Sequence, residues 1–208
     1  MGNFEKNVFI NCPFDESFES LLRPLIFTIV YLDFNPRIAL EDSDGSVNRP
    51  SKILKLIRES KYSIHDLSRI KSVTKNEFAR LNMPFELGID FGAKEFSKKH
   101  KDKKFLVLSE KEHEYKKAFS DFAGFDANIH EKNPIELVII IRNWVYETIG
   151  ITNIETGIII WYKFEEFLLY LSKNRFAQGY RGDKKLQTIF PIKEYIQLIK
   201  DWKAIAKK

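Results

Sequence analysis

The stretch that decides the fold runs from Asn7 to Val30 and reads NVFINCPFDESFESLLRPLIFTIV. Its apolar run from Val8 to Asn11 predicts a short buried strand. Apolar residues then recur at helical spacing from Phe18 to Val30, and the residues between, Cys12 to Asp15, predict a turn. A strand, a turn and a helix in this order form the first unit of an alternating α/β pattern.

The same unit recurs through the first 130 residues. Further strands are predicted at residues 37–40, 62–67, 105–108 and 127–130, and further helices at 51–59, 84–96 and 114–122. Strands that alternate with helices predict an α/β fold with an open, doubly wound parallel sheet of about five strands, of the flavodoxin-like kind. Gly88 and Gly92, one turn apart, predict that their helix lies close to the sheet.

The pattern changes near Asn133, after which only helices are predicted. The first spans 134–150, with Asn133 as its cap and Gly150 as its stop, and two more span 157–173 and 191–207. Residues 174–188 are expected to form a loop. We therefore expect an α/β domain over residues 1–131 and an all-helical extension, residues 132–208, packed on it.

Composition excludes several classes of protein. There are 34 Lys and Arg against 29 Asp and Glu, a net charge of only +5, and the densest basic run, residues 98–104, has no stacking aromatics interleaved, so a nucleic-acid partner is not expected. The single cysteine, Cys12, excludes an internal disulfide, and the four histidines show no metal-ligand spacing, so no metal is predicted. With no apolar stretch of membrane-spanning length, we expect a cytoplasmic protein without membrane contact.

Ligands of open parallel sheets bind at the carboxyl ends of the strands, and polar residues collect there in this sequence. The candidate substrate-binding residues are Asn11, Pro13, Phe14 and Asp15 after the first strand, Asp42 and Asp44 after the second, Asp66 and Ser68 after the third, and Asn82 near the following helix. The sequence contains neither GxGxxG nor a Walker motif, which disfavours hydride transfer and nucleoside triphosphate hydrolysis.

A resemblance to a known family lies in the same region. The strand ending in Asp66, Leu67 and Ser68, followed after a variable loop by Phe-Glu-Leu-Gly at residues 85–88, resembles nucleoside 2-deoxyribosyltransferases and the related TIR-like domains. The resemblance covers roughly residues 6–130, and the acidic loop 41–47 lies where TIR domains carry their BB loop. It implies that Glu86 is the catalytic carboxylate and that Asp66 contacts a ribose or nucleotide.

Both groups cleave N-glycosidic bonds, so the resemblance implies this chemistry. A carboxylate suits it because breaking the bond develops positive charge on the sugar. Nicotinamide leaves NAD as a neutral molecule without a strong general acid, which favours NAD as the substrate, with no separate cofactor, and ADP-ribose or a cyclic product. The alternative is a nucleoside or nucleotide 2-deoxyribosyltransferase or nucleosidase. Arg80 and Asn82 stand where the transferases usually carry an acidic residue and a Gly-Thr pair. In bacteria such domains often act in antiphage defence, which the resemblance implies only as a family tendency.

A third hypothesis needs no catalysis. If the helix starts at Pro84, Glu86 is its third residue, where a carboxylate caps free amides. The protein would then be a nucleotide-sensing or protein-assembly module. Cys12 and His65 are expected to be packed core residues rather than catalytic groups. The aromatic helices of the extension are expected to leave an apolar face for a homo-oligomer or a partner protein.

Overall fold

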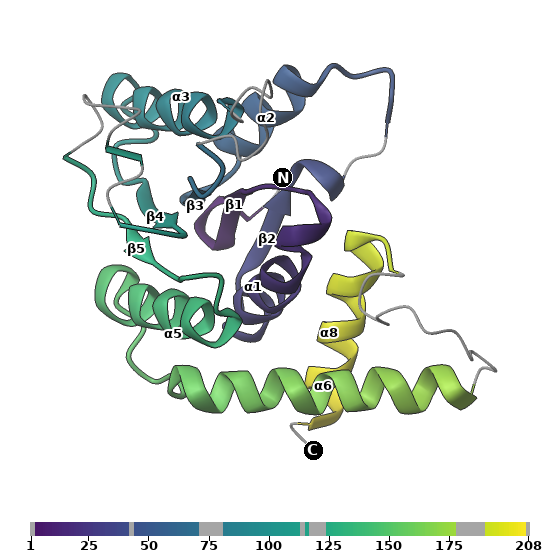
Figure 1. Ribbon diagram of the computed structural model, residues 1–208. Coiled ribbons are helices and arrows are strands. Elements are labelled where there is room, and N and C mark those ends of the chain that lie inside the picture. Colours follow the sequence, from purple (N-terminus) through teal and green to yellow (C-terminus); the bar gives the residue numbers. More distant parts are fainter. Residues whose placement is uncertain are drawn as a thin grey trace, which may run out of the picture.

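Five strands form one all-parallel sheet in the order β2-β1-β3-β4-β5, which confirms the doubly wound α/β fold (Figure 1). The computed structural model describes residues 3–41, 44–70, 81–112, 115–116, 124–177 and 190–206. The elements are η1 (Phe4–Lys6), β1 (Asn7–Asn11), η2 (Glu16–Phe18), α1 (Glu19–Tyr31), β2 (Asn35–Ile38), η3 (Ala39–Glu41), α2 (Arg49–Arg58), β3 (Tyr62–Asp66), α3 (Asn82–Phe96), β4 (Lys104–Ser109), β5 (Asn128–Ile129), α5 (Pro134–Trp144), the π-helical turn η5 (Val145–Ile149), α6 (Gly157–Ala177) and α8 (Ile192–Ala206).

Helices cover both faces of the sheet because successive residues of a strand point to opposite faces. In β1, Val8 and Ile10 belong to the same apolar cluster as α1 and α5, whereas Phe9 packs with Ile53 and Ile57 of α2. Figure 1 shows α1 and α5 on one side of the sheet and α2 and α3 on the other. Because both faces of β1 are covered by helices, the interior of this strand is a continuous apolar run, as is typical of parallel sheets.

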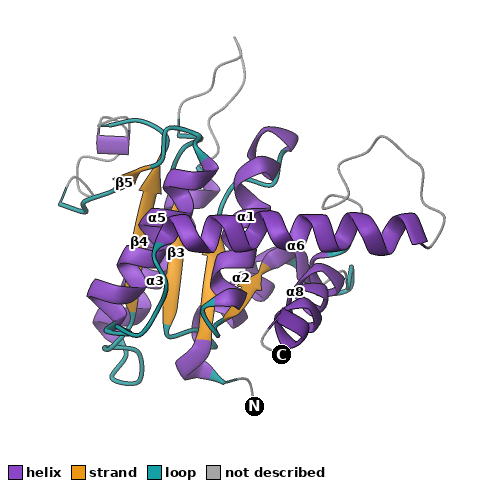
Figure 2. Cartoon of the chain, turned by 90° about the horizontal axis from the view of Figure 1, so that it is seen from below, coloured by secondary structure: helices purple, strands orange, loops and turns teal. Residues whose placement is uncertain are grey.

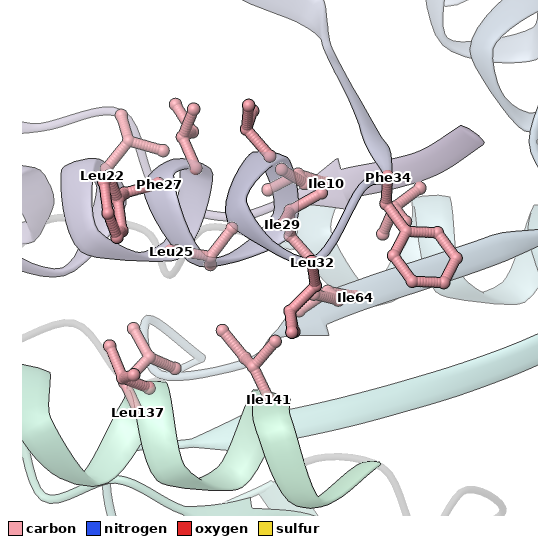
Figure 3. Packing of buried hydrophobic residues seen from close by; sticks show 14 of the residues in the cluster. Ile10, Leu22, Leu25, Phe27, Ile29, Leu32, Phe34, Ile64, Leu137 and Ile141 are labelled. Carbon is pink, nitrogen blue, oxygen red and sulfur yellow. The ribbon is translucent and has the colours of Figure 1, made fainter. Parts of the chain in front are cut away.

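The main core lies between the sheet, α1 and α5. Leu137 and Ile141 of α5 point toward α1 and toward Ile64 of β3 (Figure 3). Helix α6 lies outside α1 and α5, and α8 lies beside α1 (Figure 1). Phe167 of α6 stacks on Phe27 of α1, and Trp202 of α8 packs against the same ring at a tilt. The predicted boundary at residue 131 therefore does not interrupt the core. No helix in the described part of the chain is long and apolar enough to cross a membrane.

Several element ends differ from the prediction for local reasons. Helix α2 begins at Arg49, two residues early, because the Asn48 side chain accepts the N–H of Ser51 at 2.9 Å. Strand β2 spans residues 35–38 and is followed by a 3-10 turn at 39–41. Helix α6 continues to residue 177, so the start of the predicted loop is helical, and residues 178–189 lie outside the described residues. Most of the predicted helix 114–122 also lies outside them.

The prediction about glycines was wrong for Gly92. A Cβ placed on Gly92 would meet only its own helix neighbour Phe96, at 3.8 Å, so this glycine makes no close contact with the sheet. The close approach is at Gly157, where an added Cβ would lie 2.6 Å from the Cα of Ile139. The absence of a side chain at Gly157 therefore lets α6 pack closely against α5. Gly150 ends the turn after α5 as predicted, with a φ of 89° that favours glycine.

Candidate functional site

The carboxyl edge of the sheet has a topological switch point between β1 and β3. The chain leaves β1 through α1 on one face and leaves β2 and β3 through α2 and α3 on the other, so the loops after β1 and β3 diverge there. Asn11 at the end of β1 lies in register with His65 of β3. The residues predicted to bind a ligand after these two strands therefore lie at neighbouring strand ends.

Glu86 is a buried carboxylate near this edge, with only 6% of the residue exposed. Helix α3 begins at Asn82 rather than Pro84, so Glu86 is its fifth residue, and the first turn holds no acidic group. The prediction that Glu86 occupies the third, amide-capping position is therefore wrong. Burial raises the pKa of Glu86 to about 7, although the charge of Arg49 and a hydrogen bond from the Asn82 side chain act in the opposite direction.

Arg49 is a functional candidate that the sequence analysis missed. It is the first residue of α2, its charge acts on Glu86, and its guanidinium lies over the ring of Phe14, 5.6 Å from the centroid. Arg49 thus contacts Phe14 and acts through its charge on Glu86, which also accepts a hydrogen bond from Asn82. The Asn-Arg-Pro sequence at 48–50 is a helix-start signal that would have placed Arg49 in the first turn of α2.

A buried polar network supports this end of α3. The Asn11 amide donates to the main-chain oxygen of Met83 at 2.8 Å and lies 3.0 Å from Nδ1 of His65. Nδ1 of His65 therefore accepts, and Nε2 donates to Asp90 at 3.1 Å. Lys103 completes the network with its Nζ 3.0 Å from the other Asp90 oxygen. His65 is confirmed as a hydrogen-bonded core residue.

The network leaves two acceptors without a hydrogen bond in the described part of the chain: Oδ1 of Asn11 and Oδ1 of Asp90, which has only the ion pair with Lys103. Oδ1 of Asn11 is buried and has no hydrogen-bond partner among the described residues. A buried carbonyl oxygen without a donor is uncommon in a folded protein.

Asp66 and Ser68 belong to a second cluster, with His130. Asp66 is fully buried, and its Oδ2 lies 3.0 Å from Nε2 of His130, while Ser68 Oγ lies 3.1 Å from the same nitrogen. Nδ1 of His130 accepts the N–H of Lys132 at 3.1 Å, so the ring proton is on Nε2. This nitrogen cannot accept the Ser68 proton, so the three residues are not a nucleophilic triad. A ribose contact by Asp66 stays a prediction.

The other predicted residues lie around the edge in different settings. Asp15 accepts from Arg69 at 3.2 Å, which links the loops after β1 and β3, and Pro13 is buried. Asp44 is exposed and bonds the N–H of Ser46 at 2.9 Å within its own loop. Asp42 and Arg80 lie outside the described residues.

Cys12 is unsuited to nucleophilic attack. It is fully buried, and burial, reinforced by the charges of Asp66 and Glu86, raises the pKa of its thiol. The thiol therefore remains protonated at neutral pH, as expected for a packed core residue. The charges of Asp66 and Glu86 thus both act on the same buried thiol at this edge.

Within residues that the structure describes, no group of three or more His, Cys, Asp or Glu side chains is arranged to hold a metal ion. No family model matches the sequence, and comparison with curated proteins and with solved structures gives no match either. The class that fold and site define is thus an α/β protein with a buried carboxylate beside the switch point of its sheet.

Proposed function

We propose that the protein cleaves the N-glycosidic bond between nicotinamide and ribose in NAD, with Glu86 as the catalytic carboxylate. The observation that carries the proposal is the position of Glu86. It is a buried carboxylate beside the switch point, it is not placed as a helix cap, and its pKa is raised to about 7. Perturbed carboxylates in such a place are typical of active sites.

The chemistry follows from the charge that develops during the reaction. The C1′–N1 bond breaks, its electron pair leaves with nicotinamide, and positive charge develops on the ribose. The ionised Glu86 stabilises or covalently traps this cation. Attack by water then gives ADP-ribose, and attack by a nitrogen of the adenine gives a cyclic product.

Two cations suit a dinucleotide. The charge of Arg49 acts on Glu86, and Arg69 joins the two loops at the same edge through Asp15. An arginine binds phosphate oxygens through several N–H groups, so Arg49 would favour a substrate with a pyrophosphate over a nucleoside.

Product analysis tests the proposal. NAD, a deoxynucleoside and a nucleoside monophosphate are incubated separately with wild type, Glu86→Gln and Arg49→Ala, and the products are separated by chromatography. We expect nicotinamide from NAD with wild type and, at a higher KM, with Arg49→Ala, and a rate about 100- to 1,000-fold lower with Glu86→Gln. Base release from the nucleosides instead would establish the transferase or nucleosidase, whereas NAD binding without turnover would favour the non-catalytic sensor.

A further inference from the structure

Helix α6 has an apolar buried face, and its exposed face carries large apolar side chains among charged ones. Its buried residues recur at helical spacing and pack toward α1, α5 and α8: Ile160, Phe164, Phe167 and Leu171. The opposite face exposes Ile158, Tyr162 (59%) and Leu169 (63%). Helix α6 runs across the outside of the molecule, at the front of Figure 2. The outward face of a surface helix is normally polar, so this one is suited to a partner.

The exposed residues follow the spacing of a helix-pairing seam. Ile158, Tyr162, Glu165 and Leu169 are four, three and four residues apart, as are the a and d positions of a coiled coil. The buried Phe164 and Phe167 occupy the c and f positions on the other side. We call these four residues the α6 seam.

We infer that the α6 seam pairs antiparallel with the α6 seam of a second copy of this chain, about a two-fold axis that passes between Lys163 and Phe164. In this register Ile158 meets the partner's Leu169, and the hydroxyl of Tyr162 donates to the carboxylate of the partner's Glu165. Each contact occurs twice by symmetry.

The seam selects a second copy because it is complementary to itself in that one register. The apolar pair of Ile158 with Leu169 and the polar pair of Tyr162 with Glu165 are both centred on the same point of α6. An isologous interface requires such self-complementarity, whereas an unrelated partner does not impose it. Helix α6 has 21 residues and is about 32 Å long, which gives the pair a contact of several turns.

Disulfide crosslinking tests the pairing directly. The only natural cysteine, Cys12, is fully buried, so thiols introduced on α6 are the accessible ones. Copper–phenanthroline oxidises two adjacent thiols to a disulfide, and the reagent takes up two electrons while two protons are released. We expect a covalent dimer from the double variant Ile158→Cys with Leu169→Cys and little from either single variant. Crosslinking of the single Ile158→Cys variant instead would show parallel pairing and overturn the proposal.

Light scattering after size exclusion tests the dimer without new cysteines. Wild type is expected at near twice 24.5 kDa, and Leu169→Glu is expected to raise the dimer dissociation constant about 100-fold, because two buried leucines are lost per dimer. Ile205→Glu on α8 is the matched control, since Ile205 is as exposed (58%) and lies off the seam. A monomeric wild type at every concentration, or a dimer that Leu169→Glu leaves unchanged, would overturn the proposal.

Discussion

The side-chain amide of Asn11 donates to the main-chain oxygen of Met83 at 2.8 Å and so ties the end of β1 to the first turn of α3. Glu86 lies three residues beyond this contact. The position of the candidate catalytic carboxylate therefore depends on a strand that lies more than 70 residues earlier in the chain.

Replacement of Asn11 is expected to loosen this contact. Asn11→Ala leaves the Met83 oxygen and Nδ1 of His65 without their donor and should lower the free energy of unfolding by about 1 to 3 kcal/mol. Asn11→Asp keeps the shape but cannot donate, so it should cost at least as much. Urea unfolding measures both; two variants as stable as wild type would show that the contact is unimportant.

The buried pair of Lys103 and Asp90 gives a second prediction. Lys103→Met leaves the buried Asp90 carboxylate without its cation and the main-chain oxygen of Ile57 without its donor, so we expect a loss of about 3 to 5 kcal/mol. Lys101→Met, at an exposed neighbour, is the control and should change stability by less than about 0.5 kcal/mol. Equal unfolding midpoints for the two variants would refute the assigned role of Lys103.

Glu86 should make stability depend on pH. Its pKa is about 7 in the folded protein against an ordinary value of 4.5. Between pH 4.5 and pH 7, Glu86 is therefore protonated in the folded state and ionised in the unfolded state. Stability is thus fully present below pH 4.5 and falls as pH rises to about 7, by up to about 3 kcal/mol. Glu86→Gln removes this term. We expect the difference in unfolding free energy between variant and wild type to grow over that range, in favour of the variant, and a constant difference would contradict the burial of Glu86.

Close packing of α6 on α5 predicts the effect of Gly157→Ala. The new methyl group would lie 2.6 Å from the Cα of Ile139, so the helices must separate, at a cost of about 1 to 3 kcal/mol. Gly92→Ala is the control in α3, where the nearest atom is 3.8 Å away and alanine should stabilise the helix by up to about 1 kcal/mol. Thermal unfolding of the two variants should shift in opposite directions, and parallel shifts would rule out the close contact.

Much of the fold could be predicted because alternation and hydrophobic spacing are local properties. The run from Val8 to Asn11 and the helical spacing after Phe18 define strand and helix without information from the rest of the chain. Helix starts were less predictable, since Asn48 and Pro84 each permit more than one starting residue. Because of this ambiguity, the sequence alone predicts a capping position for Glu86, which the structure does not show.

The candidate site could be predicted only in part. Strand ends located Asn11 and Asp66, but their partners come from distant segments: Met83 for the first and His130 for the second. The pairing of Asp90 with Lys103 has no sequence signal, because a charged residue looks the same in a sequence whether it is buried or exposed. Arg49 carried a usable signal in its helix-start motif.

The most direct test of the central claim is the rate of nicotinamide release from NAD by wild type and by Glu86→Gln, with NAD binding to both measured by calorimetry. We predict that wild type releases nicotinamide, that the variant does so at a rate about 100- to 1,000-fold lower, and that both bind NAD similarly. Equal rates in the two proteins, or NAD binding with no release by either, would contradict the assignment of Glu86 as a catalytic carboxylate.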